Sequence, residues 1–338
     1  MSDVYEWLEA QDVYPKILIG DNAAVGCAAF YETAPEASDA RIWGGMEFDG
    51  PWKGFWLPMR EYGSDVERPA GDGFPERPHM DLGSDANQMD WVENVEHCLK
   101  LIEEGAVQKI VLARRSTVDG VDPYELLKAM RGGVPYLFQV SSDVTFVGCT
   151  PEHLFRREGR RIFIEAVAGT HTDPEVLLAS DKNRREHAWV REDVMQKIES
   201  FCDSYEMGDV GIKDAGGICH LHSPFEGVLK GSVNDGQLLE QLHPTPAMGG
   251  VPWTVAKQWI AKLESFQRGW YAAPLGFYTK ERAQFIVAIR CALLIKNKMH
   301  LFAGTGIVKG ADPLVEWDEL NHKTEAWRCK IRECSMST

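Results

Sequence analysis

The sequence lacks long hydrophobic runs and an excess of positive charge. Its longest apolar stretch, residues 285–295, is about half the length of a membrane span and carries Arg290 at its middle. The chain has 36 Lys and Arg residues against 51 Asp and Glu residues, a formal net charge of −15. Nucleic acid and anionic membranes would repel such a chain, so we expect neither as a partner.

Sorting signals and cysteine motifs are also missing. The first ten residues, MSDVYEWLEA, are acidic and lack the basic start and apolar core of a signal peptide. The eight cysteines include no CxxC pair and no zinc-finger spacing, which favours free thiols in a reducing compartment. We therefore expect a cytoplasmic protein. The glycines of AGTG (303–306) lack a phosphate-loop lysine, so nucleotide binding has no support.

The chain is long enough for a large core, since 44% of its 338 residues are hydrophobic. It shows no internal repeat and no obvious linker, so we predict a single domain over residues 1–338. Within it, residues 1–87 read as an irregular, variable part with an exposed turn at GDGFPERP (71–78), and residues 88–332 carry the recognisable motifs.

Hydrophobic periodicity predicts both helices and strands. Apolar residues at helical spacing predict helices over 87–104, 180–202, 252–266 and 313–332, and Asp122-Pro123 before YELLKAM predicts a short capped helix. Strands are predicted at 109–115, 136–140, 145–148 and 161–164, then at WYAAPLGFY (270–278), FIVAIRCALLI (285–295) and MHLFAGTGIV (299–308). Adjacent strands joined by tight turns indicate an α+β fold of large antiparallel sheets flanked by helices.

Two basic residues lie in apolar strands. Arg290 forms a core salt bridge, faces solvent, or clamps a substrate carboxylate, which guanidinium binds through two parallel hydrogen bonds. Lys109 either extends its amine to water or points into a closed pocket, where burial favours the uncharged amine that can accept a proton. The spacing alone leaves both alternatives open.

Carboxylates recur on two of the predicted helices. Glu316, Glu319 and Lys323 share one face of the last helix, which is usually a solvated face with charge pairs. Glu186, on the long central helix, makes a second interpretation possible, because carboxylates from two helices suit Mg²⁺. His220 and His222 would share a face of a strand, but no third ligand has zinc-site spacing, which favours two ordinary histidines.

Taken together, the motifs from Lys109 onward resemble the chorismate-utilising enzymes: the isochorismate, salicylate, anthranilate and aminodeoxychorismate synthases. In chain order they are QKIVLARR, TPEHLF, AVAGT, LLASDKNRREH, HLHSPFEGVLKG, LHPTPAMGGVP, ESFQRGWYAAPLGFY, FIVAIRCALLI and FAGTGIVKGADPLVEWDELNHK. The resemblance covers about two-thirds of the chain. It implies an anthranilate synthase component I-like fold, with chorismate as the small-molecule substrate.

The resemblance also implies roles for single residues. Lys109 matches the family's general base, and Glu152 of TPE matches its general acid. Glu186 and Glu319 match the Mg²⁺ carboxylates, with Glu316 joining through a water. Arg290 and Tyr271 match residues that hold the pyruvyl carboxylate, and Thr170 and Lys323 match positions near the ring carboxylate and the metal. The expected substrate contacts are therefore Thr170, His243, Tyr271, Arg290, Gly304, Gly306 and Lys323.

Three details favour isochorismate synthase within this family. LHPTPA, which contains His243, is typical of these enzymes, whereas amine-transferring relatives carry a lysine where this chain has Trp253. Ala168 stands where aminodeoxychorismate synthases have a lysine. Salicylate synthase, which goes on to eliminate pyruvate, and a non-catalytic chorismate-binding protein stay open as alternatives. The motifs do not distinguish the menaquinone, siderophore and salicylate pathways, and the resemblance implies a monomer or weak homodimer.

Overall fold

The computed structural model describes residues 2–50, 53–71, 73–74, 81–215 and 217–336. Within these residues the strands form two sheets in which every strand pair is antiparallel. Sheet 1 has the order β15 (Gly250–Val251), β7 (Lys109–Asp119), β19 (Lys298–Val308), β18 (Cys291–Ile295), β9 (Val144–Thr150), β8 (Val134–Ser141), β1 (Lys16–Ile19), β2 (Asn22–Val25) and β6 (Arg60–Glu61).

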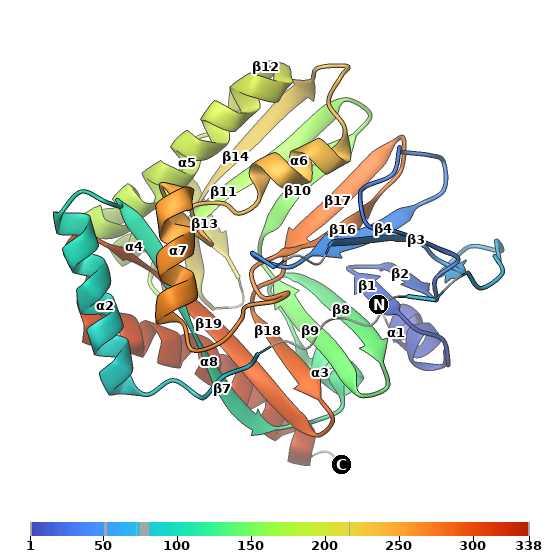
Figure 1. Cartoon of the computed structure of the whole chain (residues 1–338), viewed down its shortest axis with the longest axis horizontal. Helices are drawn as coiled ribbons and strands as arrows, with labels where there is room; N and C mark the ends of the chain where they lie inside the picture. Colours follow the sequence, from blue (N-terminus) through green and yellow to red (C-terminus); the bar gives the residue numbers. More distant parts are fainter. Residues whose placement is uncertain (1, 51–52, 72, 75–80, 216, 337–338) are drawn as a thin grey trace.

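Sheet 2 faces sheet 1 across the middle of the molecule (Figure 1). Its order is β12 (Cys202–Met207), β14 (Cys219–Leu229), β11 (Arg161–His171), β10 (His153–Glu158), β17 (Arg282–Val287), β16 (Pro274–Tyr278), β4 (Ile42–Met46), β5 (Lys53–Leu57) and β3 (Ala29–Tyr31), with β13 (Gly211–Asp214) paired to β14. The predicted α+β fold of large antiparallel sheets flanked by helices is confirmed.

The helices lie along and between the sheets. They are α1 (Ser2–Glu9), α2 (Gln88–Glu103), α3 (Pro123–Ala129), α4 (Pro174–Ala179), α5 (Asp181–Phe201), α6 (Asp235–Leu242), α7 (Trp253–Leu263) and α8 (Pro313–Met336). α5 packs on β11 and β14, and α8 packs on β19 (Figure 1). No helix of the described residues is long and apolar enough to cross a membrane.

Local capping explains why the predicted helices begin where they do. The side chain of Asn87 accepts a hydrogen bond from the backbone of Asp90 at 2.9 Å, and Asp122 and Ser180 cap α3 and α5 in the same way. A cap satisfies the backbone donors that the first turn of a helix leaves free, so a capping residue marks where a helix starts. The predicted starts of these three helices agree with the structure to within about one residue.

The expectation of a single strand over FIVAIRCALLI is wrong. Residues 282–287 form β17 in sheet 2, whereas residues 291–295 form β18 in sheet 1. The chain crosses between the sheets at Arg290, whose φ of 49° lies in the left-handed region that a side chain rarely adopts. The crossing ends both strands and places Arg290 between the two sheets rather than within one.

The interpretation of residues 1–87 as irregular is also wrong. Their short strands extend both sheets, with β1, β2 and β6 in sheet 1 and β3, β4 and β5 in sheet 2. Trp43 and Trp56 from these strands are fully buried. The largest buried cluster joins them to Phe277 and Leu320 from the other end of the chain. The expected turn at 71–78 falls mostly outside the described residues, and the single domain stays a prediction.

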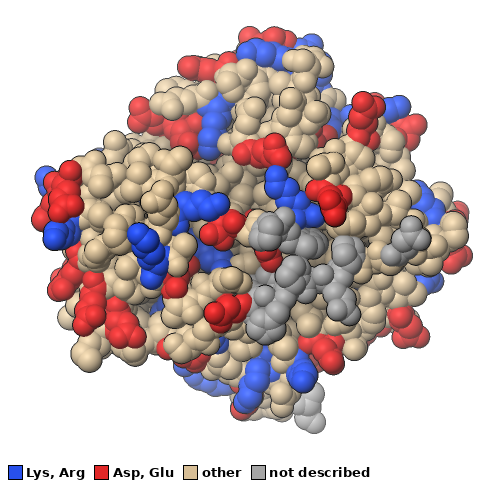
Figure 2. Space-filling model, viewed as in Figure 1, with Lys and Arg blue, Asp and Glu red and all other residues tan. Residues whose placement is uncertain are grey.

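Charge and cysteine follow the expected pattern. On the face shown in Figure 2, acidic side chains are spread among basic and uncharged ones, with no broad basic area. All eight cysteines lie in the described residues as free thiols, and all except Cys329 and Cys334 are buried.

Candidate active site

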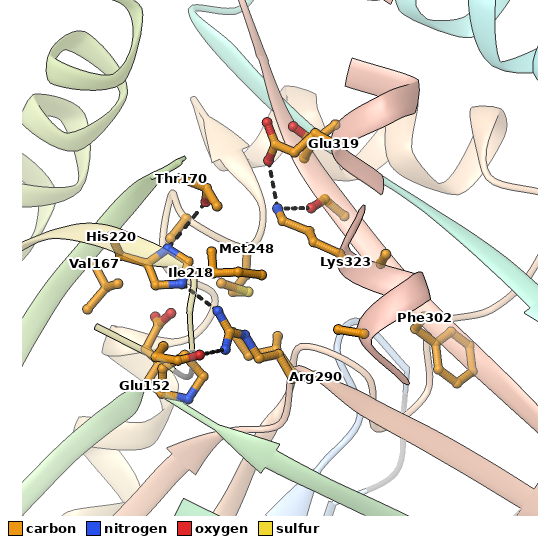
Figure 3. Close-up of a pocket in the computed structure, with 18 of the residues that line it drawn as sticks. Glu152, Val167, Thr170, Ile218, His220, Met248, Arg290, Phe302, Glu319 and Lys323 are labelled. Atoms are coloured by element: carbon orange, nitrogen blue, oxygen red, sulfur yellow. Dashed lines mark hydrogen bonds and ion pairs between the residues drawn. The ribbon is translucent and has the colours of Figure 1, made fainter. Parts of the chain in front are cut away.

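A cavity of about 270 Å³ lies where the two sheets meet, with walls from β7, β11, β14 and β19 and from helices α5 and α8. Figure 3 shows Glu152, His220 and Arg290 on one side of it, and Glu319 and Lys323 of α8 on the other. The predicted site residues that line it are Glu152, Thr170, Glu186, Tyr271, Arg290, Gly304, Gly306, Glu319 and Lys323.

The three other predicted residues are not in the cavity wall. Lys109 lies just behind it, against Glu186. Glu316 is fully buried beneath it and accepts a hydrogen bond from Thr305 Oγ1 at 2.6 Å. His243 is directed elsewhere: its ring bonds the carbonyl of Phe48 at 3.0 Å, and burial lowers its pKa to about 4. A neutral histidine that holds the backbone of another segment has no free donor for substrate, and the substrate contact of His243 stays a prediction.

Lys109 and Glu186 form a buried ion pair. Lys109 begins β7 between β15 and β19, its side chain is 0% exposed, and its Nζ lies 2.9 Å from Glu186 Oε1. Among the described residues, Nζ makes no hydrogen bond of good geometry. Of the two alternatives for this lysine, extension to water is therefore wrong, since the amine lies inside the protein.

Gly306 makes room for this pair. A Cβ placed on it would lie 2.4 Å from Glu186 Oε1 and 2.9 Å from Lys109 Cε. Real Cβ atoms do not make contacts this short, so a side chain here would displace one member of the pair. The close packing of the pair against β19 therefore requires glycine at position 306.

Glu152 is the cavity's buried acid. It lies between β9 and β10, where its backbone accepts a hydrogen bond from Val287 at 3.1 Å, and its residue is 3% exposed. The pKa of Glu152 is raised to about 8: burial raises it most, Lys213 opposes the rise, Glu165 adds to it and Lys109 opposes it. The carboxyl is therefore protonated at neutral pH and can donate a proton.

Arg290 lines the cavity, and two hydrogen bonds fix the position of its guanidinium group. It donates hydrogen bonds to the carbonyl of Ala215 and to His220 Nε2, the latter at 2.7 Å. Because guanidinium has no acceptor, Nε2 must be the unprotonated nitrogen, and Nδ1–H then donates to the carbonyl of Gly169 at 3.1 Å. Burial lowers the pKa of His220 to about 3, and Arg290 adds to the effect, so the ring stays neutral.

His220 is thus a residue whose part in the site was missed. HLH lies on a strand, β14, on which His220 and His222 belong to separate networks. His222 bonds Glu165 Oε1 at 3.0 Å, which leaves the two rings without a shared ligand. Only the arginine that His220 meets, 70 residues later in the chain, reveals its position in the site.

Tyr271 closes the cavity near the glycines of β19. Its ring stacks on Phe302 with centroids 5.2 Å apart, and a Cβ on Gly304 would lie 2.8 Å from its hydroxyl. Burial raises the pKa of Tyr271, so its hydroxyl remains a proton donor. Glycine at 304 is needed for this close approach.

Glu319 and Lys323 lie one turn apart on α8. Lys323 Nζ lies 2.7 Å from Glu319 Oε1 and 2.8 Å from the carbonyl of Gly304 (Figure 3). Burial raises the pKa of Glu319, but Lys323 and then Lys182 outweigh burial and the pKa is lowered. Glu319 is therefore an anion at the cavity wall, with the amine of Lys323 beside it.

The carboxylates fit a hard cation in chemistry, and each is paired with a lysine. Glu186 and Glu319 reach the same cavity from two helices, and Mg²⁺ needs only one or two carboxylates besides water and substrate oxygens. No cluster of three or more His, Cys, Asp or Glu side chains in the described residues is arranged to hold a metal. The donor set suits magnesium, and the site itself stays a prediction.

Comparison with known proteins supplies the family. The family profile described as "Chorismate binding enzyme" matches residues 65–329. The chain belongs to the chorismate-binding enzyme family. Isochorismate synthase MenF of Haemophilus influenzae is 30% identical to it over an alignment of 376 residues, covering 95% of this chain and 87% of the relative.

Two solved structures agree with the fold. The menaquinone-specific isochorismate synthase MenF of Escherichia coli superposes with a TM-score of 0.83 at 26% identity, covering 97% of this chain and 91% of that one. Anthranilate synthase component I of Streptococcus pneumoniae gives a TM-score of 0.72 at 16% identity over 93% and 92% of the two chains. The second likeness supports the fold alone.

Proposed function

We propose that this member of the chorismate-binding enzyme family is a magnesium-dependent isochorismate synthase. The observation that carries the proposal is a single cavity with a protonated buried acid, Glu152, and a clamp for a carboxylate, Arg290, above a buried amine, Lys109. The isochorismate synthases among its relatives support the same reaction. Chorismate is a dianion, and a net charge of −15 makes these few placed cations necessary to bind it.

Binding begins with the two carboxylates of the substrate. Arg290, oriented by His220, and the hydroxyl of Tyr271 hold the pyruvyl carboxylate, assisted by backbone amides near Gly304 and Gly306. Thr170 and Lys323 lie on opposite walls of the cavity, where they would contact the ring carboxylate. Mg²⁺ held by Glu186 and Glu319, with Glu316 joining through water, would bind that carboxylate and stabilise charge developing in the ring.

Two proton transfers then exchange the hydroxyl. Lys109, uncharged, accepts a proton from the water that attacks ring carbon 2. The double bonds shift, and Glu152 donates its proton to the hydroxyl leaving carbon 4, which departs as water. Glu186 Oε1 lies 2.9 Å from the amine of Lys109, so Glu186 has to be engaged elsewhere before the amine can contact the attacking water.

The cavity wall favours water over ammonia as the nucleophile. Ala168 lines the cavity where aminodeoxychorismate synthases have a lysine. Trp253, where the amine-transferring relatives carry a lysine, packs edge-on against Phe48 with ring centroids 5.6 Å apart. Both positions are therefore apolar in this chain.

Product identification tests the proposal. The full chain is incubated with chorismate and either MgCl₂ or EDTA, and products are separated by chromatography. We expect isochorismate only with magnesium. Recovery of unreacted chorismate in both arms would refute the proposed enzymatic activity. Stoichiometric pyruvate, measured by coupling to lactate dehydrogenase, would indicate salicylate synthase instead.

Variants assign the two proton carriers. Lys109→Ala and Glu152→Gln should each lower turnover by about 10²–10⁴-fold while chorismate still binds, because each removes one proton transfer. Lys16→Met is a matched control, since Lys16 is also a buried lysine but lies on β1, where it donates to the carbonyl of Glu9. Normal turnover in either site variant would remove that residue from the mechanism.

A further inference from the structure

Lys182 occupies an unfavourable place for a cation. It is the second residue of α5, after the cap Ser180. The start of a helix carries partial positive charge, which disfavours lysine there. Its side chain crosses instead to α8, where the ammonium donates a hydrogen bond to Glu316 and forms an ion pair with it. A specific partner, rather than helix preference, therefore holds Lys182 in position.

Lys182 pairs directly with one of the three carboxylates proposed for the metal site, Glu316. Each of the other two has a lysine of its own: Lys109 Nζ lies 2.9 Å from Glu186, and Lys323 Nζ lies 2.7 Å from Glu319. Three lysine side chains thus face three carboxyl groups.

We propose that Lys182 is the internal counter-ion of the metal site and lowers its affinity for Mg²⁺. The ammonium neutralises carboxylate charge that would otherwise attract the dication, and it has to give up Glu316 when that carboxylate turns to the metal. This inference rests on the proposed function, because the magnesium site is part of that function.

A purely structural ion pair would behave differently. Glu316 is fully buried, so loss of Lys182 would leave an uncompensated carboxylate and destabilise the fold. If the pair were only structural, added Mg²⁺ would not restore that stability. If Lys182 is the counter-ion, the dication takes over its role, and stability returns when Mg²⁺ binds.

Calorimetric titration of Mg²⁺ into the EDTA-treated, dialysed full chain tests the proposal without substrate or turnover. In Lys182→Met we expect the Kd for Mg²⁺ to fall about tenfold or more, which corresponds to about 1.4 kcal/mol. Lys182→Arg keeps the charge and should bind like the wild type. Lys298→Met is the matched control, because Lys298 also pairs with a carboxylate, that of Asp119 at 2.6 Å. This pair is exposed, at the end of the strands β7 and β19.

Thermal unfolding supplies the second readout. Lys182→Met should unfold at a lower temperature than the wild type in EDTA and regain most of the difference in millimolar MgCl₂. The proposal is overturned if Lys182→Met binds Mg²⁺ no more tightly than the wild type, or if its loss of stability is the same with and without Mg²⁺. Failure of the proposed function is recognised separately, by the absence of isochorismate from wild-type protein in the chromatographic assay.

Discussion

Replacing Glu152 by glutamine should stabilise the protein in mildly alkaline solution while it removes most of the activity. The side chain is buried, and burial raises its pKa to about 8 from an ordinary value of 4.5. Because the folded-state pKa is the higher one, folding favours the protonated acid. Its contribution is complete below the unfolded-state pKa and is lost as the pH rises towards about 8. Glutamine has nearly the same shape and no proton to lose.

The size of the effect follows from linkage. With pKa values of 4.5 unfolded and about 8 folded, ionisation of Glu152 costs the wild type about 4 kcal/mol more at pH 9 than at pH 5. Other groups titrate in both proteins and cancel in the difference between them. Urea unfolding of the wild type and Glu152→Gln at pH 5, 7 and 9 should therefore show a gap in unfolding free energy that grows with pH.

The control lies on the adjacent strand. Glu158 ends β10 and is exposed, so Glu158→Gln should show no gap that grows with pH. A gap for Glu152→Gln that stays constant within about 1 kcal/mol from pH 5 to pH 9 would refute the buried, protonated acid. The same proton sets the pH profile: wild-type kcat/KM should decline above about pH 8, as the general acid ionises.

Three further outcomes are expected. Gly306→Ala should lower kcat about 100-fold or more with little change in the circular dichroism spectrum, because the new Cβ displaces Glu186 or Lys109; unchanged kinetics would contradict the short contacts. His220→Leu should raise the KM for chorismate about tenfold and change kcat less, since Arg290 loses one acceptor that orients it, and steady-state kinetics would show this split. Treatment with EDTA should abolish isochorismate formation and added MgCl₂ should restore it, whereas full activity in EDTA would rule out a required metal.

Local signals in the sequence were sufficient to predict α2, α3, α5, α7 and α8, whereas the shorter helices α1, α4 and α6 were not predicted. Asn87, Asp122 and Ser180 cap helices that begin beside them, and capping depends only on residues within one turn. The strands in residues 1–87 could not be predicted, because they are two to five residues long and too short to show an alternation of apolar and polar residues. The sequence also did not reveal the break at Arg290, because both flanking strands are equally apolar although they belong to different sheets.

The site divides in the same way. Its chemical groups could be named from motifs, and nine of the twelve named residues do line one cavity. The side chains that these groups contact could not be predicted from the sequence. That Lys109 meets Glu186, that His220 meets Arg290, and that Lys182 meets Glu316 are contacts between distant segments, which sequence spacing does not encode.

By itself the sequence determined the kinds of element, the antiparallel α+β architecture and the inventory of acids, bases and cations, because each depends on residue type and short-range periodicity. The tertiary structure alone decided which lysine faces which carboxylate, that Glu152 is buried deeply enough to keep its proton, and that His243 is directed away from the cavity. Burial and long-range pairing arise only when the two sheets close on each other. They set the protonation states on which the proposed reaction depends.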